Sequence, residues 1–165
     1  MSTNPQTAGY KATITYPSDT ELVITREFQA PRQLVWEAAT RPEHVRRWYG
    51  AGQGNFTVCD IDLRVGGRWH YVIEADGVEH SWSGEYREIE EPSRLVTTEG
   101  YDPIPGASYL STWTLEEHDG VTTMRTHLQY DSTQARDGHV GSGMEPGMNA
   151  SLDALEALLR GLQSA

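Results

Sequence analysis

The sequence contains little of what disulfide frameworks, metal centres and membrane spans require. Cys59 is the only cysteine among 165 residues, which excludes an internal disulfide and a thiolate metal cluster. The six histidines show no H-x-x-x-H or H-x-H spacing, so we expect no metal site. No apolar run approaches the roughly 20 residues of a membrane-spanning helix. The N-terminal segment lacks the basic and apolar regions of a signal peptide, and we expect a cytoplasmic protein.

Basic residues are also scarce. The chain has 13 Lys and Arg against 24 Asp and Glu, and its formal net charge is −11. This charge opposes binding to nucleic acid or to anionic membranes, where Lys and Arg must neutralise phosphate. The glycine-rich stretch GAGQGN, Gly50 to Asn55, lacks the third glycine of a dinucleotide loop and follows a predicted helix rather than a strand. We therefore expect no nucleic-acid partner, no membrane partner and no cofactor.

Two Asp-Gly turns predict antiparallel hairpins. A two-residue turn at Asp76-Gly77 needs positive φ at both positions, and the flanking segments alternate as strands do. This register places one set of side chains on a single face of the sheet: Trp69, Tyr71, Ile73, Ala75, Val78, His80, Trp82 and Gly84. A turn at Asp119-Gly120 gives a second apolar face with these cross-strand pairs: Leu115 and Met124, Trp113 and Thr126, Tyr109 and Tyr130. Each hairpin thus has one apolar face and one polar face.

The strand signals describe one antiparallel sheet. Strand character appears over residues 11–16 and 21–28, and about six further strands are predicted over residues 55–131. The length of the chain suits a single domain over residues 11–165. Residues 1–10 are polar and unpatterned, and we expect a disordered tail there.

Three helices are predicted around this sheet. Two short helices lie over residues 30–40 and 41–48, and Thr40 with Glu43 is expected to form a capping box for the second. The last helix, over residues 144–162, carries an apolar stripe of Met and Leu side chains. An antiparallel sheet with one apolar face must bury that face, so this helix is expected to cover it.

Polar residues near the aromatic face are the candidates for chemistry. The first hairpin places His80 beside Trp82, as a hydrogen-bonded structural residue or as a polar anchor or general acid/base. Glu99 and Tyr101 lie on the next strand, where a bulge could turn them to either face. An inward, unpaired Glu99 would be costly and therefore functional. Four other histidines are predicted at the surface: His44, His118, His127 and His139.

Four segments resemble, in order and spacing, the SRPBCC proteins related to the activator of the heat-shock-protein ATPase: ITREFQAPRQLVWEAATRPEHVRRWYG, DLRVGGRWHYV, SGEYREIEEPSRLVTTEGY and SGMEPGMNASLDALEALL. The resemblance covers nearly the whole chain from about Thr13. It implies an α+β, START-like helix-grip fold, in which a curved antiparallel sheet of about six to seven strands wraps a long C-terminal helix over a deep, mostly apolar cavity. Two short helices lie between the first strands. No single activity follows, because this fold carries many functions.

Two positions depart from the family pattern. The family usually has WWGP where this chain has Trp48-Tyr49-Gly50-Ala51, and we expect this change to alter the loop at the cavity mouth. The family usually has Arg at the position of His70, which lies on the predicted polar face. We expect the second change to have little effect on ligand choice.

The leading functional prediction is a binding protein for a small hydrophobic molecule, cyclic or aromatic, in an internal cavity. Aromatic side chains bury about 150–250 Å² each, and a single helix cannot cover so many rings without voids. A cofactor-independent enzyme of cyclase, dehydratase or hydrolase type and a chaperone-interaction module are the alternatives, and a homodimer stays open. No residue is assigned a catalytic role. The predicted ligand-binding residues are Trp69, Tyr71, His80, Trp82, Tyr86, Glu99, Tyr101, Trp113, Leu115, Met124, Met144 and Met148.

Overall fold

The computed structural model describes residues 12–104 and 108–164, and the tail predicted over residues 1–10 lies outside this range. The strands of the described chain are β1 (Thr13–Thr15), β2 (Glu21–Phe28), β3 (Asn55–Ile61), β4 (Arg68–Ala75), β5 (Val78–Glu90), β6 (Arg94–Tyr101), β7 (Ser108–His118) and β8 (Val121–Gln129). Its helices are α2 (Arg32–Thr40), α3 (Pro42–Trp48), α4 (Thr133–Gly141) and α5 (Met144–Ser164).

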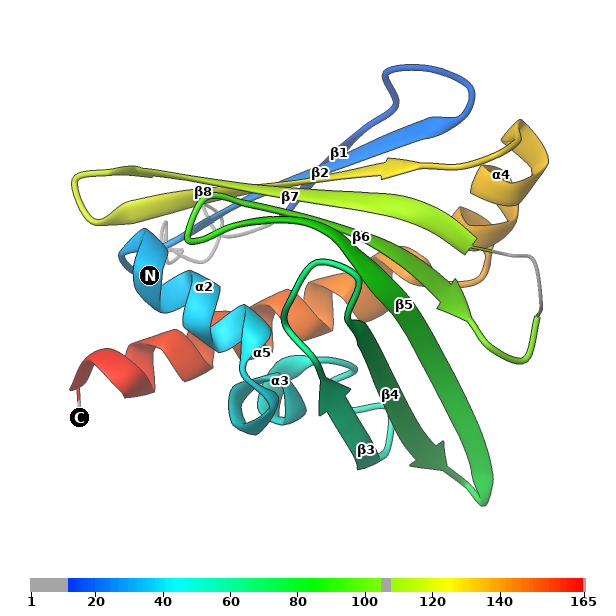
Figure 1. The fold of residues 1–165 in the computed structure, drawn as a ribbon, viewed down its shortest axis with the longest axis horizontal. Helices are drawn as coiled ribbons and strands as arrows, with labels where there is room; N and C mark the ends of the chain where they lie inside the picture. The colour runs from blue at the N-terminus through cyan, green and yellow to red at the C-terminus, as the bar shows by residue number, and fades with distance from the viewer. Residues whose placement is uncertain (1–11, 105–107, 165) are drawn as a thin grey trace, which may run out of the picture.

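The strands form one antiparallel sheet in the order β1-β2-β8-β7-β6-β5-β4-β3. Strands β3 to β8 follow one another as a meander, and β2 pairs with β8 from the other end of the chain. The sheet curves around α5, which runs along its concave side next to α2 and α3 (Figure 1). This is the α+β helix-grip fold that the resemblance implies. It has eight strands rather than six to seven, because both N-terminal segments join the sheet and the short β1 pairs with β2 at its edge.

Both Asp-Gly turns have the predicted backbone and register. Asp76 and Asp119 have φ of 53° and 52°, and the glycines that follow them have φ of 78° and 81°. The first hairpin pairs Tyr71 with Trp82, and the strands of the second hairpin also pair in the predicted register. The predicted aromatic face is therefore the inner face of the sheet, toward α5.

The core lies between this inner face and the helices. Leu155 and Leu159 of α5 and Trp36 of α2 are at most 2% exposed. Full burial of a large apolar side chain stabilises a fold by roughly 1.5–3 kcal/mol, so these contacts hold the helices on the sheet. Arg26 on the inner face of β2 is also buried, and its Nη1 donates to Asp153 Oδ1 of α5 at 2.8 Å. This ion pair links the long helix to β2.

The start of α3 differs from the prediction. The helix begins with Pro42, and its N-terminal flanking residue Arg41 makes no side-chain capping bond. The Thr40 hydroxyl donates instead to the Trp36 carbonyl of the preceding helix at 2.7 Å. The predicted capping box of Thr40 and Glu43 is therefore wrong, because the hydroxyl is already used at the end of α2.

The segment between β8 and α5 contains a helix that the sequence did not predict. No residue of helix α4 is fully buried, so it has no apolar stripe that would reveal it. The Ser132 hydroxyl caps its start by accepting from the Ala135 amide at 3.0 Å. Helix α5 itself begins at the predicted Met144 and ends at Ser164, shortly past the predicted Leu162.

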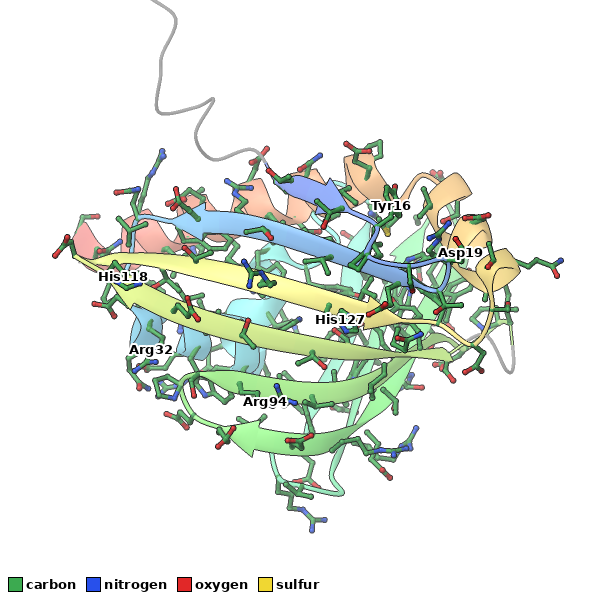
Figure 2. All side chains as sticks on the ribbon, turned by 90° about the horizontal axis from the view of Figure 1, so that it is seen from above. Tyr16, Asp19, Arg32, Arg94, His118 and His127 are labelled. Carbon is green, nitrogen blue, oxygen red and sulfur yellow. The ribbon has the colours of Figure 1, made fainter. Side chains whose placement is uncertain are left out.

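The outer face of the sheet carries polar side chains (Figure 2). Nε2 of His127 lies 2.6 Å from Glu21 Oε2, and Nε of Arg94 lies 3.4 Å from Glu88 Oε1. Such pairs at the protein surface contribute little to stability, because water screens them. The polar face of the sheet is thus exposed, as the alternation of its strands predicts.

Candidate functional site

Three ring side chains gather on the inner face of β5 and β6. Trp82 and Tyr101 are paired across these strands, with ring centroids 5.6 Å apart. The imidazole of His80 stacks on Trp82 at a centroid distance of 6.2 Å, and its Nδ1 lies 2.8 Å from Tyr101 Oη. His80 therefore lies on the aromatic face, where the Asp-Gly register predicts it.

Glu99 points to the same inner side. A bulge in β5 between Tyr86 and Glu88 shifts the pairing with β6. Tyr101 faces inward beside Trp82, and Glu99, two residues earlier on the same strand, shares its face. Across the next strand pair, the Tyr109 hydroxyl donates to Glu99 Oε1 at 2.8 Å. The orientation that the sequence leaves open is thus the inward one.

The Glu99 carboxyl group is removed from bulk water. Burial raises the pKa of Glu99, and the hydrogen bond from Tyr109 opposes part of that rise. The cause is the loss of hydration of the charged form. The Glu99 side chain nevertheless keeps accessible surface and is only partly buried. It is therefore enclosed by protein without being packed on every side.

A second ring cluster surrounds Tyr109. Its ring centroid lies 4.9 Å from that of Tyr130 and 5.1 Å from that of His139. The Tyr130 hydroxyl and His139 Nδ1 share a hydrogen bond. Burial lowers the pKa of His139, which favours its neutral form. The predicted surface position of His139 is wrong, because α4 carries this side chain against the two tyrosine rings.

Tyr49 reaches the site from the loop between α3 and β3. Its ring contacts the edge of the Tyr71 ring at a centroid distance of 4.9 Å. Burial, and then the charge of Glu99, raise the pKa of Tyr49. The Gly50 amide donates to Ser151 Oγ of α5 at 3.0 Å and ties this loop to the helix. Sequence reasoning missed Tyr49, although the departure from the family's WWGP motif lies at this position and was the available signal.

The predicted ligand-binding residues fall into two groups. Five are buried in the core: Trp69, Tyr71, Tyr86, Leu115 and Met124. Seven keep accessible surface on or beside the inner face: His80, Trp82, Glu99, Tyr101, Trp113, Met144 and Met148. The hydrogen bonds join His80 to Tyr101 and Glu99 to Tyr109, so a direct acid/base pair of His80 with Glu99 is not formed.

A separate hollow of about 410 Å³ opens on the outer face, lined by Asp60, Arg68, Trp69, His70, Ser83 and Asp102. Nε2 of His70 lies 2.9 Å from Ser81 Oγ and 3.8 Å from Asp102 Oδ2. In a nucleophilic triad the imidazole uses one nitrogen for serine and the other for aspartate. Here one nitrogen faces both groups, and the Ser81 hydroxyl already donates to Asp102. This arrangement does not activate Ser81 as a nucleophile.

The described part of the chain has neither a metal site nor a membrane-spanning helix. Within residues 12–104 and 108–164, no group of three or more His, Cys, Asp or Glu side chains could hold a metal ion. No helix in the same ranges is both long enough and apolar enough to cross a membrane. The inner face around Glu99 remains the candidate site.

Comparison with known proteins identifies the family. The sequence profile described as activator of Hsp90 ATPase homolog 1-like protein matches residues 29–160. The chain belongs to this family. The AHSA-like family is part of the SRPBCC superfamily, so the resemblance drawn from the four motifs is confirmed. No curated protein matches the chain significantly.

Solved structures of bacterial proteins share the fold of this AHSA-like chain. A protein from Rhodobacter sphaeroides is 28% identical with a TM-score of 0.86, over 92% of this chain and 99% of that protein. Protein Ms6760 from Mycobacterium smegmatis is 29% identical with a TM-score of 0.80, over 90% of this chain and 96% of that protein. Protein NE0264 from Nitrosomonas europaea, 23% identical over 91% of this chain and 100% of its own, has a TM-score of 0.81. These similarities establish the fold and do not identify a ligand.

Proposed function

We propose that this protein binds a small, largely apolar molecule, cyclic or aromatic, between the inner face of the sheet and α5. The observation that carries the proposal is the state of Glu99, whose pKa is raised by burial while its side chain keeps accessible surface. A carboxyl group in this state supports a site that is shielded from bulk water but not filled by protein side chains. Internal space with aromatic walls and few polar groups is the usual form of a small-molecule site.

The side chains around Glu99 support an apolar ligand. Three large aromatic side chains of the inner face are only partly buried: Trp82, Tyr101 and Trp113. Met144 and Met148, in the first turns of α5, are also partly buried, and methionine adapts to apolar shapes of many kinds. Well-packed cores leave few voids. Incomplete burial of so many large side chains therefore favours ligand binding over core packing alone.

Tryptophan fluorescence and thermal denaturation with a library of aromatic and alicyclic compounds test this proposal. We expect a subset of compounds to quench the fluorescence saturably and to raise Tm, because a ligand that binds only the native state stabilises it. Trp82→Phe should remove most of the quenching. The matched control Trp36→Phe, in the buried part of α2, should retain it. Absence of both effects across the library would contradict the proposal.

The two other predicted functions give different results with the same library. A cofactor-independent enzyme would convert one of the bound compounds, and mass spectrometry would detect its product. A chaperone-interaction module would bind none of them. The hydrogen bonds of His80 to Tyr101 and of Glu99 to Tyr109 give both titratable groups protein partners, which favours anchoring over proton transfer.

A further inference from the structure

Glu99 is a partly buried acid without a cationic partner among the described residues. Its hydrogen bond in the described chain comes from Tyr109 Oη, and it forms no ion pair within residues 12–104 and 108–164. By contrast, the buried Glu156 of α5 lies 3.8 Å from Arg160 Nε. A buried carboxylate is costly unless a cation or several donors compensate its charge. The inner face therefore contains an acid whose charge the described residues leave uncompensated.

Phenol groups lie on the same side of the sheet as this carboxyl group. Tyr109 donates to it, and the Tyr130 ring packs on Tyr109. Burial, and in smaller part the charge of Glu99, raise the pKa of four of these groups: Tyr49, Tyr71, Tyr109 and Tyr130. They come from four parts of the fold, namely the loop after α3, β4, β7 and the residue after β8. The imidazole that packs on two of these rings, His139, has a pKa lowered by burial and so favours its neutral form. Ring faces attract cations, and the cluster thus combines a carboxylate with aromatic walls.

We propose that the ligand carries a protonated amine, which pairs with the Glu99 carboxylate while its ring system packs against Trp82. This inference rests on the proposed function and specifies the class of ligand as ring-containing amines. An anionic ligand would add a second uncompensated charge, and a neutral hydroxyl group would leave the first one in place. An ammonium group supplies the missing countercharge, and Tyr109 can keep its bond to Oε1. The net charge of −11 also favours the approach of a cation.

Because Glu99 can be protonated, the affinity for an amine should depend on pH. In the free protein, burial raises the pKa of Glu99, and a paired ammonium group opposes that rise. Amine binding therefore favours the ionised carboxylate. The affinity for an amine should fall as the pH falls through the pKa of Glu99, whereas the affinity for a neutral ligand of the same shape should change little.

Calorimetric titration with three matched probes tests the inference: naphthylethylamine, naphthylethanol and naphthylpropionate. At neutral pH we expect the amine to bind about tenfold or more tightly than the alcohol, and the carboxylate to bind most weakly. Glu99→Gln should lower the amine affinity about tenfold or more and change the alcohol affinity much less. The matched control Glu116→Gln, an exposed carboxyl group on β7, should change neither. Circular dichroism shows whether each variant is folded.

The outcomes separate this inference from the proposed function. Equal binding of amine and alcohol, or an unchanged amine affinity in folded Glu99→Gln, would overturn the inference that the ligand is an amine. The proposed function would still stand. The unsubstituted protein gives the same answer without a variant, because its amine-to-alcohol affinity ratio should fall as the pH is lowered from neutral through the raised pKa of Glu99. A ratio near one throughout, or binding confined to library compounds without an amine, would overturn the inference. No binding by the three probes or by any library compound would overturn both.

Discussion

At the scale of single residues, the site depends on a carboxyl group whose burial opposes its ionisation. An acid with a raised pKa in the folded state binds its proton more tightly there than in the unfolded chain. Its contribution to stability is therefore fully present below the ordinary pKa and is lost as the pH rises through the raised one. Burial raises the pKa of Glu99 in this way, and the hydrogen bond from Tyr109 offsets only part of the effect.

Glu99→Gln isolates this contribution, because glutamine keeps the size of the side chain and cannot ionise. We expect the free energy of unfolding of Glu99→Gln, relative to the natural protein, to increase as the pH rises from the ordinary pKa of glutamic acid through the raised pKa of Glu99. Burial also raises the pKa of Glu156, but that residue is present in both proteins and cancels in the difference. Urea denaturation of both proteins at several pH values measures this difference in unfolding free energy.

Glu116→Gln is the matched control for this pH series, because Glu116 lies exposed on β7. The difference between Glu116→Gln and the natural protein should show little dependence on pH. If the natural protein instead gains stability over Glu99→Gln as the pH rises, an unrecognised partner stabilises the Glu99 carboxylate. That result would remove the basis for an uncompensated charge on the inner face.

At the scale of elements, the parts that the sequence predicts are those specified by local signals. The Asp76-Gly77 turn alone sets the pairing of β4 with β5, so the inward position of His80 follows from it. The face of Glu99 could not be predicted, because the bulge at Tyr86 and Glu88 lies inside β5 and has no turn residue to mark it. A shift of one residue exchanges the two faces of a strand.

The sequence also failed to predict helix α4 and the inward position of Tyr49. Helix α4 has no fully buried residue, so apolar periodicity gives no sign of it or of the partly buried position of His139. The position of Tyr49 depends on a tertiary hydrogen bond from the Gly50 amide to Ser151 of α5. Neither contact is encoded in the spacing of residues along one element, and both require the assembled fold.

Gly84 in β5 lets β4, β5 and β6 come close together beside the aromatic side chains of the inner face. A Cβ at Gly84 would lie 1.8 Å from the Thr98 carbonyl oxygen and 2.6 Å from Trp69 Nε1. The indole of Trp69 reaches across this position, and its Nε1 donates to Thr97 Oγ1 of β6 at 2.8 Å. The missing side chain at Gly84 therefore permits a hydrogen bond from β4 to β6.

Gly84→Ala should destabilise the protein by about 1–3 kcal/mol, because the backbone of β6 must move to admit the methyl group. The matched control is Gly138→Ala in α4, where an added Cβ meets nothing within 4 Å. That change should stabilise the protein by about 0.5–1 kcal/mol, since alanine loses less backbone freedom in a helix. Urea denaturation of both variants measures the effects. Equal stabilities for the two variants would show that the contacts of Gly84 are not restrictive.

At the scale of the whole molecule, the proposed binding space depends on how α5 is held against the curved sheet. Arg26 of β2 binds Asp153 of the helix, and Ser151 accepts from the Gly50 amide of the α3–β3 loop. These contacts attach the same helix to the sheet and to the loop that carries Tyr49. The apolar stripe of α5 and its position over the apolar face of the sheet could be predicted from the sequence, but the curvature of the sheet around the helix came from the family resemblance. Helices α2, α3 and α5 lie together on the concave side of the sheet (Figure 1).

The most direct test of ligand binding next to Glu99 follows the indole N–H signals of the five tryptophans by NMR during titration with the strongest-binding library compound. We expect the signals of Trp82 and Trp113, which are only partly buried, to shift saturably. The signals of Trp36 and Trp48, buried in α2 and α3, should change little. Unchanged signals for Trp82 and Trp113 at a concentration that saturates binding would contradict a ligand site on the inner face.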